Sequence, residues 1–178
     1  MIEAARYARE ERVPYLGLCL GMQIMVIEYS RYMLGLKEAN STEFAPETKV
    51  PVVSLLEEQV DIKAYGGTMR LGKSDTHLKR GTCIHAAYGT DVIAERHRHR
   101  YEVANQYRKD LEAAGLLVRG LTPDASLVES VEWPGHPWGV GVQFHPEFKS
   151  KPLAPSPLFS QFIAACLISQ EKSSAARA

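Results

Sequence analysis

Residues 13–21 read Val-Pro-Tyr-Leu-Gly-Leu-Cys-Leu-Gly. The apolar run before Cys19 predicts a buried parallel strand, and the apolar residues at helical spacing in residues 20–34 predict a helix directly after it. The chain therefore turns sharply from strand to helix at Cys19, which is the geometry of a nucleophile elbow. Gly17 and Gly21 flank the cysteine and allow the tight turn. The turn would place the thiol at a helix N-terminus, where the helix dipole favours the thiolate.

A structural cysteine is the alternative interpretation, because free cysteines are among the most buried residues. Cys83 and Cys166 fit it, since neither has flanking glycines at a strand-to-helix turn. For Cys19 the glycines and a histidine far downstream favour a reactive thiol.

A histidine and a glutamate two positions apart follow a second apolar run, in Gln143-Phe144-His145-Pro146-Glu147. Side chains two apart on an extended backbone point to the same side, so Glu147 can approach the His145 imidazole. Pro146 favours an extended His145 and ends the strand. A histidine oriented by a carboxylate can accept a thiol proton and return it to a leaving amine. A surface His–Glu ion pair is the alternative, and it would be preferred if this pair stood without the elbow.

Several blocks of the chain resemble known families. Residues 17–23 and 143–148 are similar to the two signatures of class I glutamine amidotransferases. The resemblance narrows to the glutaminase domain of the CTP synthase family in Asn40–Phe44, Gly66–Gly72, Glu95–Val103 and the ending Pro157-Leu158-Phe159. It runs from about Ala4 to about Ala165.

The resemblance implies hydrolysis of the glutamine side-chain amide through a thioester, with release of ammonia. It implies Cys19 as nucleophile, His145 as base, Glu147 as orienter and the Leu20 N–H as an oxyanion donor. The other residues that it implies for the glutamine pocket are Gly21, Met22 and Gln23, Glu43 for the α-ammonium, Arg100 for the α-carboxylate, and the adjacent Tyr101. A zwitterionic ligand does require one carboxylate and one guanidinium.

Two of these assignments have alternatives in the sequence. Glu43 alone would be an ordinary solvated loop glutamate. The basic run 96–100, which alternates with histidines, could by itself be a zinc site or a nucleic-acid patch. No further cluster of Cys or His completes a metal site, and 21 basic residues balance 21 acidic ones, so we expect neither metal nor nucleic acid.

The resemblance also implies a larger enzyme. In that family the domain begins before the position of Met1, with a strand and a Gly-Gly loop that supplies a second oxyanion donor. Residues 1–170 are therefore expected to be a partial domain and a weak glutaminase, because loss of such a donor costs on the order of 10²–10³ in rate. A synthetase domain in the same polypeptide would bind ATP, UTP and Mg²⁺ and aminate UTP to CTP, with GTP as allosteric activator, in a homotetramer or filament.

The expected fold class is α/β, with an open, mostly parallel sheet flanked by helices, an antiparallel extension and a flavodoxin-like core. We expect further strands at residues 52–56, 68–71, 92–96, 117–121, 127–132 and 140–144, and helices at 2–9, 107–114 and 158–170. The polar tail 171–178 is expected to be disordered.

Composition limits the number of domains, the cellular compartment and the presence of a membrane span. The chain has 178 residues, 45% of them hydrophobic, which suits one domain with a substantial core. Three irregularly spaced cysteines suit a reducing compartment, and neither a signal peptide nor a run of eighteen apolar residues is found, so we expect a cytoplasmic enzyme without a membrane span.

Two other functions stay open at this stage. A γ-glutamyl thiol hydrolase of the same fold would share Cys19 and His145, but is not expected to carry the blocks 40–44 and 96–101 together. A catalytically inactive interaction module would keep the surfaces of the domain and lose turnover.

Overall fold

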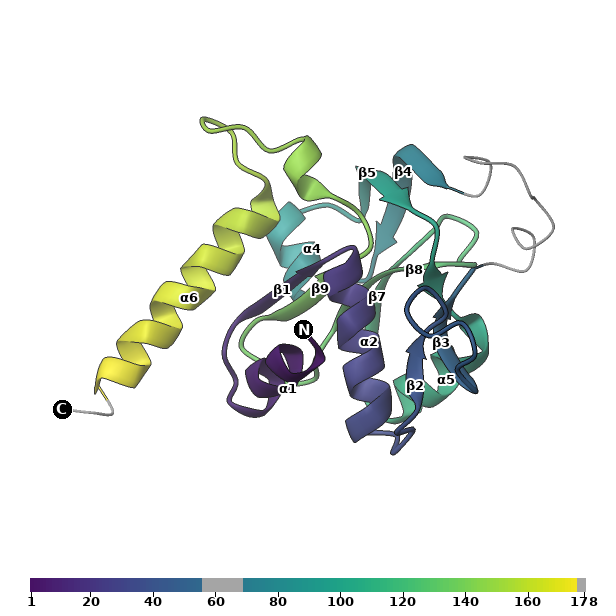
Figure 1. Ribbon diagram of the computed structural model, residues 1–178. Coiled ribbons are helices and arrows are strands. Elements are labelled where there is room, and N and C mark those ends of the chain that lie inside the picture. The colour runs from purple at the N-terminus through teal and green to yellow at the C-terminus, as the bar shows by residue number, and fades with distance from the viewer. Residues whose placement is uncertain (56–68, 176–178) are drawn as a thin grey trace.

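A computed structural model describes residues 1–55 and 69–175 of the chain (Figure 1). It opens with helix α1 (Ile2–Glu10), strand β1 (Tyr15–Leu18) and helix α2 (Leu20–Tyr32). A single residue, Cys19, separates β1 from α2, so the predicted strand-to-helix turn is confirmed.

The remaining elements are groups of strands separated by helices. In chain order they are β2 (Ala39–Ser41), β3 (Val50–Ser54), β4 (Arg70–Leu78), α4 (Cys83–Tyr88), β5 (Val92–His99), β6 (Glu102–Val103), α5 (Asn105–Ala113), β7 (Leu117–Leu121), β8 (Val128–Glu132), β9 (Gly139–Val142), the 3-10 turn η1 (Pro146–Phe148) and α6 (Pro157–Ala175). The predicted strands and helices are all present in the described residues, whereas Leu56 and Thr68, at the ends of two predicted strands, lie outside them. β2, β6 and α4 were not predicted, because they are too short to show a periodic pattern.

The strands of the described residues form two sheets. One has six strands in the order β1-β9-β8-β7-β4-β5, and the other has three in the order β2-β3-β6. The α/β architecture with an antiparallel extension is confirmed, but the extension is larger than expected: in the described residues only β1–β9 and β2–β3 pair in parallel. The connections from β7 to β8 and from β8 to β9 are too short for a crossover helix, so these strands pair as hairpins.

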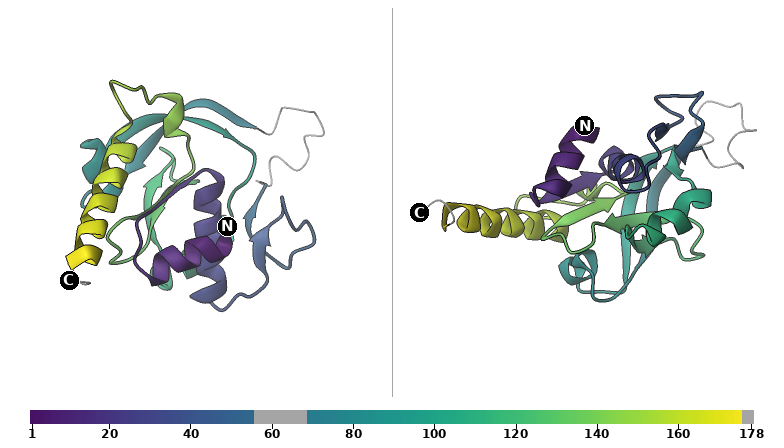
Figure 2. Two further views of the ribbon diagram at one scale, coloured as in Figure 1. Left: turned by 60° about the vertical axis from the view of Figure 1, so that its left-hand side comes forward. Right: turned by 90° about the horizontal axis from the view of Figure 1, so that it is seen from below.

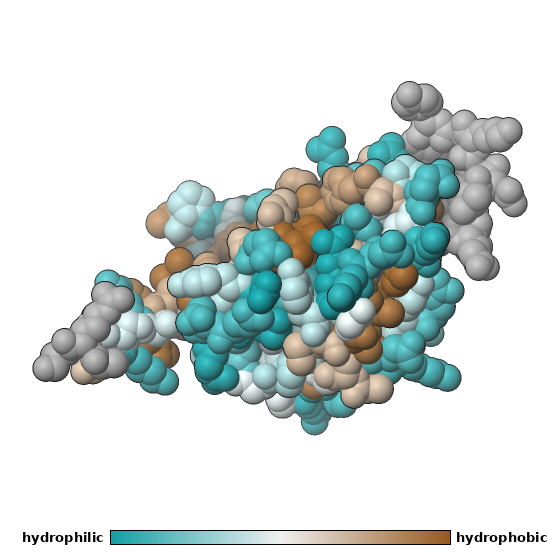
Figure 3. Space-filling model, turned by 60° about the horizontal axis from the view of Figure 1, so that its bottom comes forward, coloured by the Kyte–Doolittle hydropathy of each residue, from teal (hydrophilic) through white to brown (hydrophobic). Residues whose placement is uncertain are grey.

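Helices cover both faces of the six-stranded sheet (Figure 2). On one face α1 and α2 pack in a cluster that includes the buried Ala5, Met22 and Met25. On the other, Ile84 of α4 and Leu158 of α6 pack with the valines of β9 in a second cluster. Polar and apolar residues are interspersed on the molecular face of Figure 3.

The C-terminal helix corrects one prediction. Residues 171–175, expected to be disordered, continue α6 to Ala175, while 176–178 lie outside the described residues. The hydroxyls of Ser173 and Ser174 donate to the carbonyls of Ser169 and Gln170, so the polar residues are accommodated within the helix. Most of α6 projects from the body, and only its first turn is deeply packed (Figure 1).

No helix within residues 1–55 and 69–175 combines the length and apolar character that a membrane span requires.

Candidate functional site

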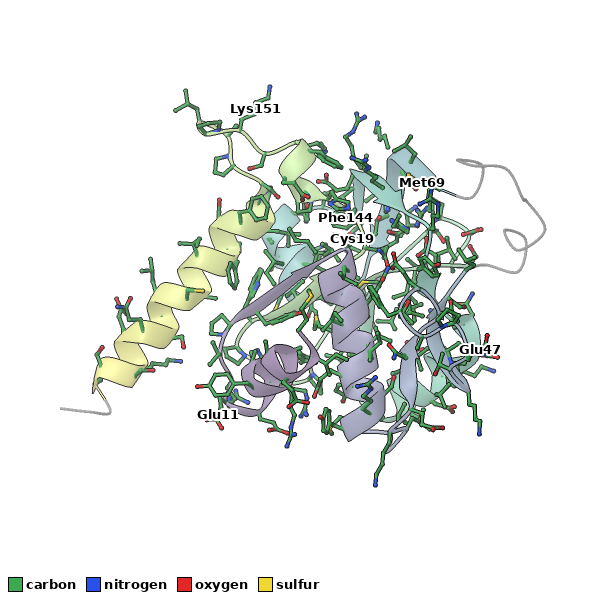
Figure 4. All side chains as sticks on the ribbon, in the orientation of Figure 1. Glu11, Cys19, Glu47, Met69, Phe144 and Lys151 are labelled. Atoms are coloured by element: carbon green, nitrogen blue, oxygen red, sulfur yellow. The ribbon has the colours of Figure 1, made fainter. Side chains whose placement is uncertain are left out.

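The elbow at Cys19 is a strained turn. Cys19 has φ of 48° and ψ of −102° and is the residue before the first turn of α2. Positive φ is costly for a residue with a side chain and occurs where the surrounding structure enforces it, often at functional sites. Here the Cys19 N–H donates to the Val142 carbonyl at 2.7 Å, which ties the turn to the end of β9. Figure 4 shows Cys19 at the upper end of α2.

The two glycines that flank Cys19 have different roles. A Cβ on Gly17 would lie 2.6 Å from the carbonyl carbon and oxygen of Gly21, so strand and helix can meet at this angle only with glycine at 17. A Cβ on Gly21 would meet only the Tyr15 hydroxyl, at 3.8 Å. The expectation that the turn needs both glycines is therefore correct for Gly17 alone.

The electrostatics of the thiol differ from the expectation. Burial is the largest cause of a pKa for Cys19 raised to about 11; the backbone N–H of Leu20 lowers this pKa, and the charges of Glu102, Glu147 and Glu43 contribute to raising it. The helix N-terminus does act in the predicted direction, but burial outweighs it. At neutral pH the thiol is therefore protonated and needs a base.

His145 carries a free nitrogen that can act as that base. Its Nδ1 donates to Glu147 Oε1 at 2.6 Å, as predicted, and the partner carboxylate assigns the proton to Nδ1. Its Nε2 is buried and has no hydrogen-bond partner among the described residues. The ring stacks on Phe148 at 5.0 Å, and the His145 N–H donates to the Arg96 carbonyl. No hydrogen bond joins His145 Nε2 to Cys19 Sγ among the described residues, but the charge of Glu147, the partner of His145, does act on the thiol.

Two buried glutamines lie beside the thiol. Gln143 Nε2 donates to Cys19 Sγ at 3.6 Å. Gln23 Nε2 donates to Gln143 Oε1 at 3.3 Å and to the Tyr101 carbonyl at 2.9 Å. This series brings together Cys19, Gln23 and Tyr101 of the predicted site and adds Gln143.

The remaining predicted pocket residues come from three separate segments. Leu20, Gly21 and Met22 form the first turn of α2, with Met22 fully buried. Glu43 is exposed in the loop after β2, and its charge reaches the thiol. Arg100 is exposed between β5 and β6.

A buried ionic cluster behind the site was not predicted. Arg70 lies 2.5 Å from Glu129 and 3.2 Å from Glu102, and His99 Nε2 lies 2.6 Å from the same Glu102 oxygen. Because side chains alternate along β5, the arginines of the 96–100 run are exposed while His97 and His99 point inward. The alternation was visible in the sequence; the partners on β4, β6 and β8 were not. No group of His, Cys, Asp and Glu within residues 1–55 and 69–175 is arranged to hold a metal ion.

Comparison with known proteins gives a consistent assignment. Residues 1–165 match the family described as glutamine amidotransferase class-I. CTP synthase of Rubrobacter xylanophilus is 57% identical over 171 residues, which cover 96% of this chain and 31% of that protein. CTP synthase of Moorella thermoacetica is 57% identical over 166 residues, 93% of this chain and 31% of that protein. The chain thus spans about a third of the length of these curated relatives.

Comparison with solved structures supports the same family. The glutaminase domain of Trypanosoma brucei CTPS with bound acivicin superposes with a TM-score of 0.88 at 39% identity, covering 93% of this chain and 64% of that one. A Thermoplasma acidophilum protein described as part of a GMP synthase shares the fold, with 16% identity and a TM-score of 0.60 over 96% of this chain and 66% of that one. With the family matched over residues 1–165, the chain belongs to the class-I glutamine amidotransferase family, within which it is similar to the glutaminase domain of CTP synthase.

Proposed function

We propose that this chain hydrolyses the side-chain amide of L-glutamine through a triad of Cys19, His145 and Glu147. The observation that carries the proposal is the state of His145. Its Nδ1 is held by Glu147 at 2.6 Å, which leaves the buried Nε2 without a partner among the described residues and able to accept a proton.

The chemistry follows from these groups. Cys19 Sγ attacks the amide carbon while its proton passes to His145 Nε2, and the oxygen takes up the negative charge. His145 then gives the proton to the nitrogen, and the C–N bond breaks to release ammonia and leave a thioester. Water hydrolyses the thioester to glutamate, with His145 again as base. Glu147 stabilises the imidazolium in both steps.

We assign substrate recognition to one exposed carboxylate and one exposed guanidinium. The Glu43 carboxylate would bind the α-ammonium and the Arg100 guanidinium the α-carboxylate. Leu20 would donate its N–H to the oxyanion, and Gly21, Met22, Gln23 and Tyr101 would line the pocket. Both charged side chains are exposed and accessible to a ligand.

The similarity to CTP synthases supports a wider role for the released ammonia. We propose that it aminates UTP at a synthetase domain of the same polypeptide, with ATP, UTP and Mg²⁺ bound outside this chain. GTP activation and assembly as a tetramer or filament are further proposals by the same similarity.

The test is glutamate release from glutamine by the purified chain and two variants. Cys19→Ala should lower the rate by at least about a thousand-fold, because no other group replaces the nucleophile. Cys83→Ala is the matched control, since this cysteine lies on α4 and is expected to keep the wild-type rate. Equal rates in the two variants, or no glutamate release by the wild-type chain, would contradict the proposal.

A further inference from the structure

The hydrogen bonds of the two buried glutamines have one possible direction. The Tyr101 backbone carbonyl can only accept, so the Gln23 atom that faces it is the amide nitrogen. The same nitrogen faces Gln143, so Gln143 presents its oxygen to Gln23 and its NH₂ to Cys19. The amide orientation, which is ambiguous for an isolated glutamine, is set here by a backbone group.

Both glutamines are removed from solvent, which makes the arrangement costly to disturb. Gln143 is 0% exposed and Gln23 is 2% exposed. A buried amide that lost its partners would bear a desolvation penalty, so each glutamine holds the other in place. We call the series Tyr101–Gln23–Gln143–Cys19 the glutamine relay.

The relay ends on the atom that reacts. A hydrogen bond donated to sulfur stabilises the thiolate more than the thiol, because the acceptor is charged in the thiolate. The carboxylates of Glu102, Glu147 and Glu43 act on Cys19 in the opposite sense, while the Leu20 N–H also favours the thiolate. A neutral donor supports the thiolate without adding a charge that would pair with these carboxylates.

We propose that Gln143, oriented by Gln23, is an additional catalytic residue that donates a hydrogen bond to the Cys19 thiolate and makes the nucleophile more reactive. The inference rests on the proposed role of Cys19 as nucleophile. It also links thiol reactivity to residues 100–101, between β5 and β6. Displacement of the Tyr101 carbonyl would free the Gln23 side chain, and Gln143 would then lose the group that orients it.

The test is the rate of Cys19 alkylation by iodoacetamide as a function of pH, followed by peptide mass spectrometry. Gln143→Met keeps the side-chain length and removes the donor. It should raise the apparent pKa of Cys19 by about one unit and slow alkylation roughly ten-fold at pH values below that pKa. Gln23→Met should shift the pKa in the same direction by less, because the Gln143 amide stays but is free to rotate.

Three controls separate the relay from loss of structure. Gln106→Met changes an exposed glutamine on α5 and should leave the profile unchanged. Cys83 in each sample is an internal reference that should be alkylated at the same rate in all variants. Gln143→Glu keeps the shape of the side chain and, as a carboxylate, should raise the thiol pKa more than the methionine does, so it carries the test if Gln143→Met does not fold.

A Cys19 profile unchanged in folded Gln143→Met, or in Gln143→Glu if the methionine variant does not fold, would overturn the proposal. Glutamate release measured on the same samples distinguishes it from the proposed function. A wild-type chain that releases no glutamate, but whose thiol pKa rises in Gln143→Met, would contradict the glutaminase assignment and support the relay as a determinant of thiol reactivity.

Discussion

Cys19 in the site and His97 behind it have pKa values that differ from those of free side chains. Burial raises the pKa of Cys19 to about 11, and burial together with the charge of Arg70 lowers the pKa of His97 to about 3. Because its pKa is raised, the Cys19 thiol depends on a base and on hydrogen-bond donors to form the thiolate. The lowered pKa keeps His97 neutral, packed edge-on against Phe144 behind the site, although Nε2 lies only 3.6 Å from Glu129.

His97 should make folding stability depend on pH. A histidine with a folded-state pKa below its unfolded value of about 6.5 binds fewer protons when folded, so stability rises with pH between about 3 and 6.5 and is lost as pH falls through that window. His97→Phe keeps a ring at this position and should reduce the difference between the unfolding free energies at pH 7 and pH 4. Urea denaturation at the two pH values measures it.

His77→Phe, on an exposed histidine of β4, serves as the control and should keep the wild-type pH dependence. If His97→Phe showed the same pH dependence as the wild type, the buried neutral state of His97 would be wrong.

At the scale of elements, the elbow depends on how closely α2 approaches the strands beneath it. Gly141 of β9 faces the helix, where a Cβ would lie 2.7 Å from Met25 Sδ, while Val140 and Val142 point to the opposite face. Gly17 allows the same close approach at the turn itself. The elbow was predictable from residues 13–34, because a strand, a turn and a helix are local patterns.

The two glycines of the motif should respond differently to substitution. In Gly17→Ala the new methyl group meets backbone atoms that cannot move independently, so the free energy of unfolding should fall by about 2 kcal/mol or more. Gly21→Ala, within the first turn of α2, should be neutral or slightly stabilising, by less than about 1 kcal/mol. Thermal and urea denaturation of both variants test this, and equal destabilisation by the two would contradict the distinction.

At the scale of the whole molecule, the two sheets are joined by α2 and by Arg70. The arginine extends from β4 of the six-stranded sheet to Glu129 on β8 and to Glu102 on β6, a strand of the three-stranded sheet. Burial raises the pKa of Glu129 to about 7 against the lowering by Arg70. The ion pair therefore offsets a desolvation cost that Glu129 would otherwise bear alone.

Substitution of Arg70 should destabilise the fold, and a second substitution at Glu129 should recover part of the lost stability. Arg70→Met leaves two buried carboxylates without their cation and should cost about 3 to 5 kcal/mol of unfolding free energy. Addition of Glu129→Gln should recover part of that loss, because it removes one of the unpaired charges. Arg98→Met, on the exposed face of β5, should change stability by less than about 0.5 kcal/mol. Additive effects of the Arg70 and Glu129 substitutions would show that the pair is not coupled.

The sequence alone predicted three features of the site: the elements next to Cys19, the position of the thiol between them, and the His145–Glu147 pair. Each depends on residues within a few positions of one another. The thiol pKa, the antiparallel majority of the described strand pairings and the partners of the inward-facing histidines emerged only from the folded arrangement. The glutamine relay belongs to this second group: its three hydrogen bonds join residues 78, 120 and 124 positions apart. The physical reason is that burial and hydrogen-bond direction depend on which distant segments come into contact. Local patterns of polarity do not determine which segments these are.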